Sequence, residues 1–144
     1  MNPKYSIIIP HKNIPHLLLR CLNSIPLHKE IQVIVVDDKS DSNIILQLQK
    51  MQKIYSSICF IYTREGYGAG YARNIGMDRA TGKWLLFADA DDFFDANFVS
   101  IIDKHFNDDD IIYFVSRSVD SNMLLPVKSR ADISKCVLSN NIKK

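Results

Sequence analysis

The sequence predicts an α/β protein, built on a mostly parallel sheet that is flanked by helices. Short runs of β-branched and aromatic residues alternate along the chain with stretches whose apolar residues recur at helical spacing. The 144 residues suit a single domain, and 47% hydrophobic with 24% charged residues is an ordinary globular composition. A chain of this length can bury a real core, so a folded domain is expected.

Three expected strands and two expected helices alternate in the first half of the chain. Residues 5–9 form a β-branched run that Pro10 ends, which is typical of a buried strand. Asn13 is the expected cap of the first helix, whose apolar face ends before Pro26. The other elements of this half are a strand over residues 31–36, an apolar helical stripe between residues 44 and 55, and a strand over residues 58–62.

The second half continues the alternation and then loses its pattern. Small residues spaced three or four apart, including Ala72 and Gly76, predict a helix that lies close on the sheet. Gly82 is its expected C-terminal stop. The later expected elements are strands over residues 84–88 and 111–115, a helix from about residue 95 to residue 106, and a short helix within residues 131–139.

Polar side chains follow three of the expected strands. They are His11, Lys12 and Asn13 after the first strand, Asp37 and Asp38 after the second, and Asp89, Asp91 and Asp92 after the fourth. Parallel strands bring such loops to one edge of the sheet, where ligands bind in open α/β folds. Crowded carboxylates favour a cation, and oxygen ligands suit Mg²⁺ or Mn²⁺. Arg73, near the start of a helix, adds a group that binds phosphate, so we expect a diphosphate ligand.

Several other function classes are not supported. The net charge of +2 gives no basis for nucleic acid binding, and no apolar run approaches the ~18 residues of a membrane span. The dinucleotide fingerprint, the P-loop, the EF-hand and zinc-binding spacings all fail on inspection. Three cysteines without a C-x-x-C spacing favour a cytoplasmic protein, with peripheral contact at the inner face of the membrane left open.

Four segments, in order and spacing, resemble family 2 glycosyltransferases. They are SIIIPHKN at residues 6–13, VVDDKSD at residues 35–41, GYARNIG at residues 70–76 and ATGKWLLFADADD at residues 80–92. Any one of these blocks alone is weak, but the four together cover about residues 5–115. The resemblance implies a GT-A (Rossmann-like) fold and transfer of a sugar from a nucleotide diphosphate sugar to a hydroxyl acceptor with inversion.

The resemblance also implies roles for individual residues. Those expected to bind the nucleotide sugar are Pro10, His11, Lys12, Asn13, Asp38, Arg73, Asp89 and Ala90. Within this set, Asp38 accepts a hydrogen bond from the base, and Arg73 contacts the base or the phosphates. Asp89 holds the ribose or a divalent metal, Mn²⁺ or Mg²⁺, and Asp91 binds this metal, which bridges the diphosphate. The implied partners are a UDP-sugar and a glycan or lipid-linked acceptor, in surface polysaccharide synthesis.

The sequence departs from the family pattern in three places. Lys12 replaces the usual aromatic residue, and Lys39 replaces the usual glycine of a turn. Only 52 residues follow Asp92, whereas the family continues with an acceptor-binding half that carries a catalytic base. Asp103, Asp120 and Asp132 are available as bases, but nothing singles one out, so the catalytic residue is unassigned.

Compared with the family pattern, we therefore expect a truncated GT-A fold. We place the nucleotide-sugar-binding GT-A core at residues 1–115, and residues 116–144 as the start of a truncated acceptor-side region or a C-terminal extension. One alternative is a non-catalytic nucleotide-sugar-binding fragment of the same fold. Another is a receiver-type signalling domain, which also has strands ending in aspartates. A sugar nucleotidyltransferase is disfavoured because no glycine-rich loop follows Ile9.

Overall fold

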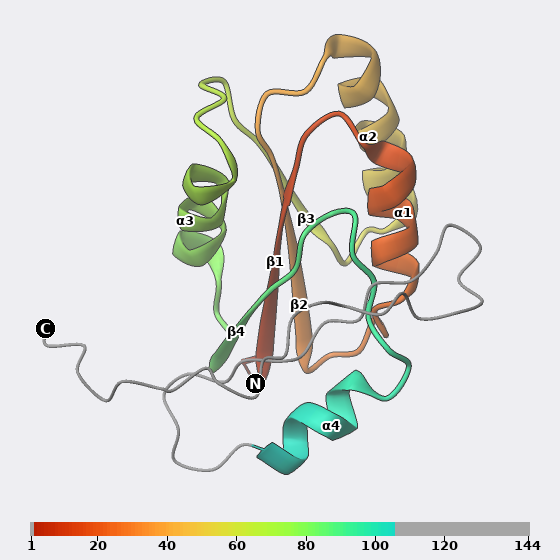
Figure 1. Ribbon diagram of the computed structural model, residues 1–144, viewed down its shortest axis with the longest axis vertical. Helices are drawn as coiled ribbons and strands as arrows, with labels where there is room; N and C mark the ends of the chain where they lie inside the picture. The colour runs from red at the N-terminus through yellow and green to blue at the C-terminus, as the bar shows by residue number, and fades with distance from the viewer. Residues whose placement is uncertain (1, 106–144) are drawn as a thin grey trace, which may run out of the picture. The chain divides into compact units, whose positions relative to one another are not determined.

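The computed structural model describes residues 2–105 and shows four strands alternating with four helices (Figure 1). In chain order they are β1 (Tyr5–His11), α1 (Pro15–Asn23), β2 (Ile31–Asp37), α2 (Ser42–Ile54), β3 (Cys59–Tyr62), α3 (Ala69–Arg79), β4 (Trp84–Phe87) and α4 (Phe98–His105). The sheet belongs to a compact unit, Met1–Ile101, and a second unit begins at Ile102.

The sheet is parallel throughout and has the strand order β3-β2-β1-β4. Tyr5 of β1 is in register with Ile31 of β2 on one side and with Trp84 of β4 on the other. The helices α1 and α2 lie on one face, and α3 lies on the other, against β1 and β2 (Figure 1). The predicted parallel sheet flanked by helices is confirmed. The strand order reverses at β1, which places the expected ligand crevice between β1 and β4.

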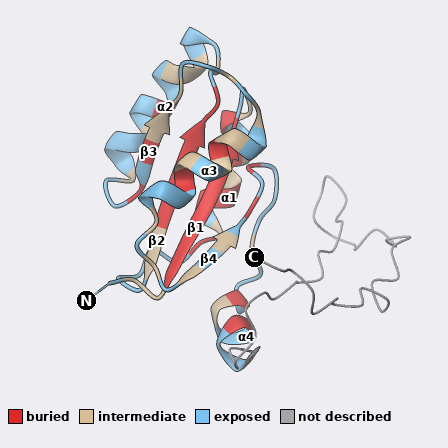
Figure 2. Ribbon diagram, turned by 90° about the vertical axis from the view of Figure 1, so that its left-hand side faces the viewer, coloured by how far each residue is buried: buried red, intermediate tan, exposed pale blue. Residues whose placement is uncertain are grey.

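Burial is greatest at the centre of the sheet and falls towards β4. Every residue of β1 is buried, as Figure 2 shows by the red strand, whereas residues of β4 alternate between intermediate and exposed. Ile34 and Val36 of β2 form a core cluster with Ala72 of α3. Each fully buried aliphatic side chain of this kind stabilises the fold by about 1.5–3 kcal/mol.

The helix α3 lies close on the sheet because the fully buried residues of its inner face are small. Ala72 and Gly76 are its buried residues, as the spacing of small residues predicts. A Cβ atom added at Gly76 would lie 2.4 Å from Cγ2 of Ile8. The inner face of α3 therefore cannot accept a larger residue at this position without movement of β1.

Two local predictions were wrong. Asn13 does not cap α1, because Ile14 is the N-cap residue and Asn13 instead adopts a positive φ of 57°. Gly82 does not end α3, which already terminates at Arg79. A Cβ atom at Gly82 would lie 2.6 Å from the backbone nitrogen of Ser6, so the glycine allows two backbone segments to approach closely.

Other predictions fall outside the described residues. These are the strand over residues 111–115, the helix within residues 131–139, the base candidates Asp120 and Asp132, and the boundary after residue 115. Among the described residues, no helix combines the length and apolar character needed to cross a bilayer.

Candidate functional site

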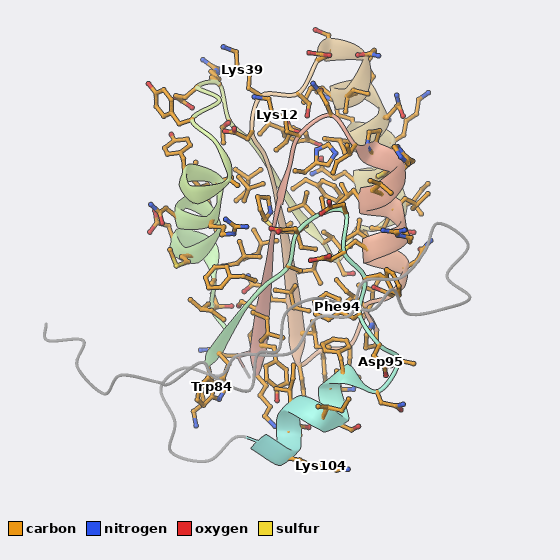
Figure 3. The ribbon with its side chains drawn as sticks, viewed as in Figure 1. Lys12, Lys39, Trp84, Phe94, Asp95 and Lys104 are labelled. Carbon is orange, nitrogen blue, oxygen red and sulfur yellow. The ribbon has the colours of Figure 1, made fainter. Side chains whose placement is uncertain are left out.

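The predicted site residues lie at the ends of strands, in the loops after them and, for Arg73, in the helix α3, around the carboxyl edge of the sheet. These loops follow β1, β2 and β4, and the loop that leads into α3 joins them. Figure 3 shows Lys12 and Lys39 at this edge, with Trp84, the first residue of β4, at the opposite end. The structure thus brings to one edge the residues that the sequence placed there.

His11 and Asp37 form a buried pair where β1 and β2 end. Nδ1 of His11 lies 2.8 Å from Oδ1 of Asp37, and the residues are 2% and 1% exposed. The backbone amide of Ile14 donates to Nε2 of His11 over 3.2 Å. Because Nε2 accepts, Nδ1 carries the proton that His11 donates to Asp37.

Ser40 and Asn13 extend this pair into a network. Asp37 accepts from the backbone amide of Ser40 at 2.9 Å and from its hydroxyl at 2.5 Å. The amide of Asn13 donates to the Ser40 hydroxyl, and Oδ1 of Asn13 accepts from the amide of Asp41, both over 2.8 Å. Burial alone would raise the pKa of Asp37, but the hydrogen bonds from His11 and Ser40 outweigh it and hold that pKa below its ordinary value.

This network gives His11 and Asn13 structural contacts in addition to the nucleotide roles predicted for them. The network joins the loop after β1 to the loop after β2 and so holds these two loops of the site together. The sequence placed Asp37 at this edge without giving it a binding role, and it did not single out Ser40. Both lie in the VVDDKSD block, beside the residue that was assigned, Asp38.

Asp38 takes part in a different contact from its neighbour. Its Oδ2 accepts from the backbone amide of Gly68 over 2.7 Å, and the hydroxyl of Thr63 lies 3.4 Å from Oδ1. Gly68 is the N-cap residue of α3 and has a φ of 97°, which favours glycine. Asp38 is 3% exposed and fixes the start of α3, the helix that carries Arg73.

Arg73 of α3 and Asp89 of the loop after β4 form an ion pair. Nη2 of Arg73 lies 2.5 Å from Oδ1 of Asp89, with side chains that are 33% and 56% exposed. An ion pair with this exposure contributes at most about 1 kcal/mol to stability. Breaking this ion pair therefore costs little free energy, so both side chains are available to an incoming phosphate or metal ion.

The loop after β4 presents three exposed carboxylates, and we call Asp89, Asp91 and Asp92 the acidic loop. Ala90 between them is buried, so the chain turns its acidic side chains outward. Burial and the charges of Asp91 and Asp89 raise the pKa of Asp92. A bound cation would relieve this repulsion.

The donor atoms of the acidic loop suit a divalent cation. Among the described residues, no group of three or more acidic, histidine or cysteine side chains is arranged to hold a metal by itself. Mg²⁺ is commonly held by one or two carboxylates together with substrate phosphates. Asp89 and Asp91 therefore fit a metal that arrives with a diphosphate, rather than a metal held in a protein cage.

The two lysines that depart from the family pattern, Lys12 and Lys39, lie on the rim of the site. Lys12 is exposed, and Lys39 is exposed with a positive φ of 61°. The family's usual glycine adopts such a conformation without strain, whereas lysine does not. The stem of Lys39 lies beside Gly66, where an added Cβ atom would be 3.0 Å from Cδ of Lys39.

Two bacterial glycosyltransferases are similar in sequence to this chain. Poly(ribitol-phosphate) beta-N-acetylglucosaminyltransferase TarS of Staphylococcus aureus is 30% identical over 114 residues, which cover 73% of this chain and 20% of TarS. Poly(ribitol-phosphate) beta-glucosyltransferase of Bacillus spizizenii is 36% identical over 95 residues, covering 62% and 15%. The chain thus matches about a fifth or less of the length of these two relatives.

Solved structures share the fold. Staphylococcus aureus TarS 1-349 in complex with UDP-GlcNAc has a TM-score of 0.60 and 28% identity, covering 71% of this chain and 32% of that one. The mannosyltransferase PcManGT from Pyrobaculum calidifontis has a TM-score of 0.58 at 21% identity, covering 69% and 31%, which shows a common fold alone. These neighbours confirm the GT-A fold.

The chain also matches a family model. The model described as glycosyl transferase family 2 matches residues 6–138, nearly the whole chain. This match excludes the receiver-type alternative. On the sequence, the strand order and the matched residues together, the chain belongs to glycosyl transferase family 2.

Proposed function

We propose that this chain binds a nucleotide diphosphate sugar, with a UDP-sugar favoured, at the carboxyl edge of its sheet. One observation carries the proposal: Arg73 of α3 meets Asp89 of the acidic loop at the crevice where the strand order reverses. A cation and exposed carboxylates at such a crevice suit a diphosphate with its metal. The similarity to a TarS structure that contains UDP-GlcNAc supports this choice of ligand.

In this proposal, different residues bind different parts of the ligand. Pro10, His11, Lys12 and Asn13 line the base pocket, and Asp38 accepts from the base in exchange for its contact with Gly68. Arg73 leaves Asp89 to contact the base or the phosphates, and Asp89 is then available to the ribose or the metal. Asp89 and Asp91 are the residues that would hold Mn²⁺ or Mg²⁺, which supplies Lewis-acid stabilisation of the leaving diphosphate.

The reaction that we propose is transfer of the sugar to a hydroxyl of a glycan or lipid-linked acceptor, with inversion. Two relatives are named for activity on poly(ribitol-phosphate), which supports a role in surface polysaccharide synthesis. A positioned base accelerates such an attack by about 10²–10⁴-fold, and the described residues offer no side chain that is singled out for this work. We therefore expect this chain alone to bind the donor with little or no transfer.

Calorimetry on the 144-residue chain tests the binding proposal. UDP and GDP are titrated in Mn²⁺ and in EDTA, with Asp38→Ala, Arg73→Ala and the control Lys50→Ala on the outer face of α2. Loss of a charge-assisted hydrogen bond costs about 1.5–3 kcal/mol, so affinity should fall roughly ten- to a hundred-fold in the two site variants. Unchanged affinity in both variants contradicts the site, and binding that is indifferent to EDTA contradicts the metal.

Turnover and location need separate measurements. Incubation with labelled donors and a panel of acceptors should show no robust transfer, and rapid turnover would contradict the non-catalytic reading of this chain. A cytoplasmic location, with peripheral contact at the inner face of the membrane, also belongs to the proposal. Cell fractionation tests it, and recovery in the medium would exclude it.

A further inference from the structure

Helix α1 contacts the acidic loop and the residues after it at two points. Arg20 and Ser24 are four positions apart, so they project from one side of the helix end. The segment they contact, residues 91–94, includes two of the exposed carboxylates. Neither Arg20 nor Ser24 belongs to the nucleotide and metal residues assigned above.

Arg20 makes the first contact. Its Nη2 donates to the backbone carbonyl of Asp91, and its guanidinium lies 5.1 Å from the ring centroid of Phe93. The side chain thus holds the loop on both sides of Asp92. Its charge also acts on the carboxylate of Asp92, where it opposes the repulsion from Asp91 and Asp89.

The Nε atom of Arg20 suggests that this side chain is not placed for stability alone. Nε is buried and has no hydrogen-bond partner among the described residues. A buried donor without a partner is unfavourable, and native structures rarely retain one without a reason. The position of the guanidinium is instead explained by its contacts with the acidic loop.

Ser24 makes the second contact. Its hydroxyl accepts from the backbone amide of Phe94 over 2.9 Å and donates to the carbonyl of Cys21 over 2.6 Å. The hydroxyl is therefore held by its own helix while it holds the loop. Phe94 lies near the C-terminal end of α1, as expected from this bond (Figure 3).

We propose that Arg20 and Ser24 act as a clamp, two positioning residues on α1 that fix the acidic loop in the conformation that receives a metal–diphosphate. The inference rests on the proposed function. Three like charges on an exposed loop repel one another, so an unsupported loop would spread its carboxylates apart. Backbone contacts on both sides of Asp92 oppose this spreading, and neither contact occupies a carboxylate oxygen of Asp89 or Asp91.

The test compares four variants of the full 144-residue chain: Arg20→Gln, Arg20→Lys, Ser24→Ala and the control Arg79→Gln, an exposed arginine in the last turn of α3. Mn²⁺ affinity in saturating UDP is measured from the free-Mn²⁺ paramagnetic resonance signal. UDP affinity in EDTA and the melting temperature are measured beside it. Substitution of a residue that orients metal ligands typically weakens metal binding by about ten- to a hundred-fold.

The clamp predicts about tenfold weaker Mn²⁺ binding for Arg20→Gln, a smaller loss for Ser24→Ala, and partial recovery in Arg20→Lys, which keeps a cationic donor. UDP affinity in EDTA should not change, and Arg79→Gln should match the parent chain. A lower melting temperature with unchanged Mn²⁺ affinity in Arg20→Gln or, where that variant is unfolded, in Ser24→Ala and Arg20→Lys would overturn the clamp. Absence of Mn²⁺ binding by the parent chain would instead overturn the proposed function, and the clamp with it.

Discussion

Two acidic regions share the carboxyl edge of the sheet, but they differ in how their carboxylates are satisfied. The first is the network of His11, Asn13, Asp37 and Ser40, in which Asp37 is 1% exposed and accepts three hydrogen bonds. The second is the acidic loop, whose carboxylates are exposed and in which Asp89 forms an ion pair with Arg73. The residue type is the same, so the partners decide the role.

The pKa values of the two regions move in opposite directions. The pKa of Asp37 is lowered because hydrogen bonds to its charged form outweigh burial. The pKa of Asp92 is raised, by burial first and then by the neighbouring carboxylates. A carboxylate that the fold stabilises contributes to folding, whereas crowded carboxylates are an unfavourable feature that a bound cation can offset.

Removing the buried carboxylate should give the largest effect. Asp37→Ala leaves the Nδ1 proton of His11 and the amide of Ser40 without their acceptor in a buried site. We expect a loss of about 3 kcal/mol in the free energy of unfolding. Urea denaturation measures it, with Asp41→Ala as control because the exposed side chain of Asp41 makes no capping bond. A loss of less than about 1 kcal/mol would contradict the structural role of this network.

Removing a carboxylate from the acidic loop should weaken ligand binding and leave stability almost unchanged. Asp91→Asn keeps the shape and removes one charge, so we expect Mn²⁺-dependent UDP binding to weaken by roughly tenfold or more, while stability changes by less than about 0.5 kcal/mol. Calorimetry and thermal melting together measure both quantities. The control is Asp78→Asn on the exposed side of α3, which should change neither. Equal affinity in the two variants would remove Asp91 from the metal site.

The pH dependence of stability in acid should also report on the buried region, through Asp37. Because the folded pKa of Asp37 lies below its ordinary value of 3.8, the unfolded chain binds more protons near that pH. The stabilisation from Asp37 is complete above pH 3.8 and is lost as the pH falls through the lowered pKa. We expect the pH dependence of stability below about pH 4 to be shallower in Asp37→Asn than in the parent chain. Identical slopes would contradict this sign.

Much of the fold could be predicted because its signals are local. Buried strands such as residues 5–9 are continuous apolar runs, and the small residues of α3 recur at helical spacing. The division of labour between Asp37 and Asp38 could not be predicted. Neighbouring residues at a strand end point to opposite faces, and only the packing shows that Asp37 meets His11 while Asp38 meets Gly68.

The clamp on α1 was also beyond prediction from the sequence. Arg20 and Asp91 are 71 positions apart, and no motif joins them. β1 and β4 are adjacent parallel strands, and the chain after β4 contacts the last turn of α1, the helix that follows β1. Gly82 and Asn13 were misread for a similar reason, since each is required by a contact with a distant backbone segment rather than by its own helix.

The smallest predicted effect concerns Lys39, which links the buried network to the rim. Its φ of 61° costs a lysine about 1–2 kcal/mol, and glycine avoids this cost but loses about 0.5–1 kcal/mol to chain entropy. Lys39→Gly should therefore stabilise the fold by about 0.5–1 kcal/mol, measured by urea denaturation. Lys39→Ala keeps the strain and removes the same charge, so it should not stabilise. Equal stability of the two variants would show that charge, not backbone conformation, sets the effect at this turn.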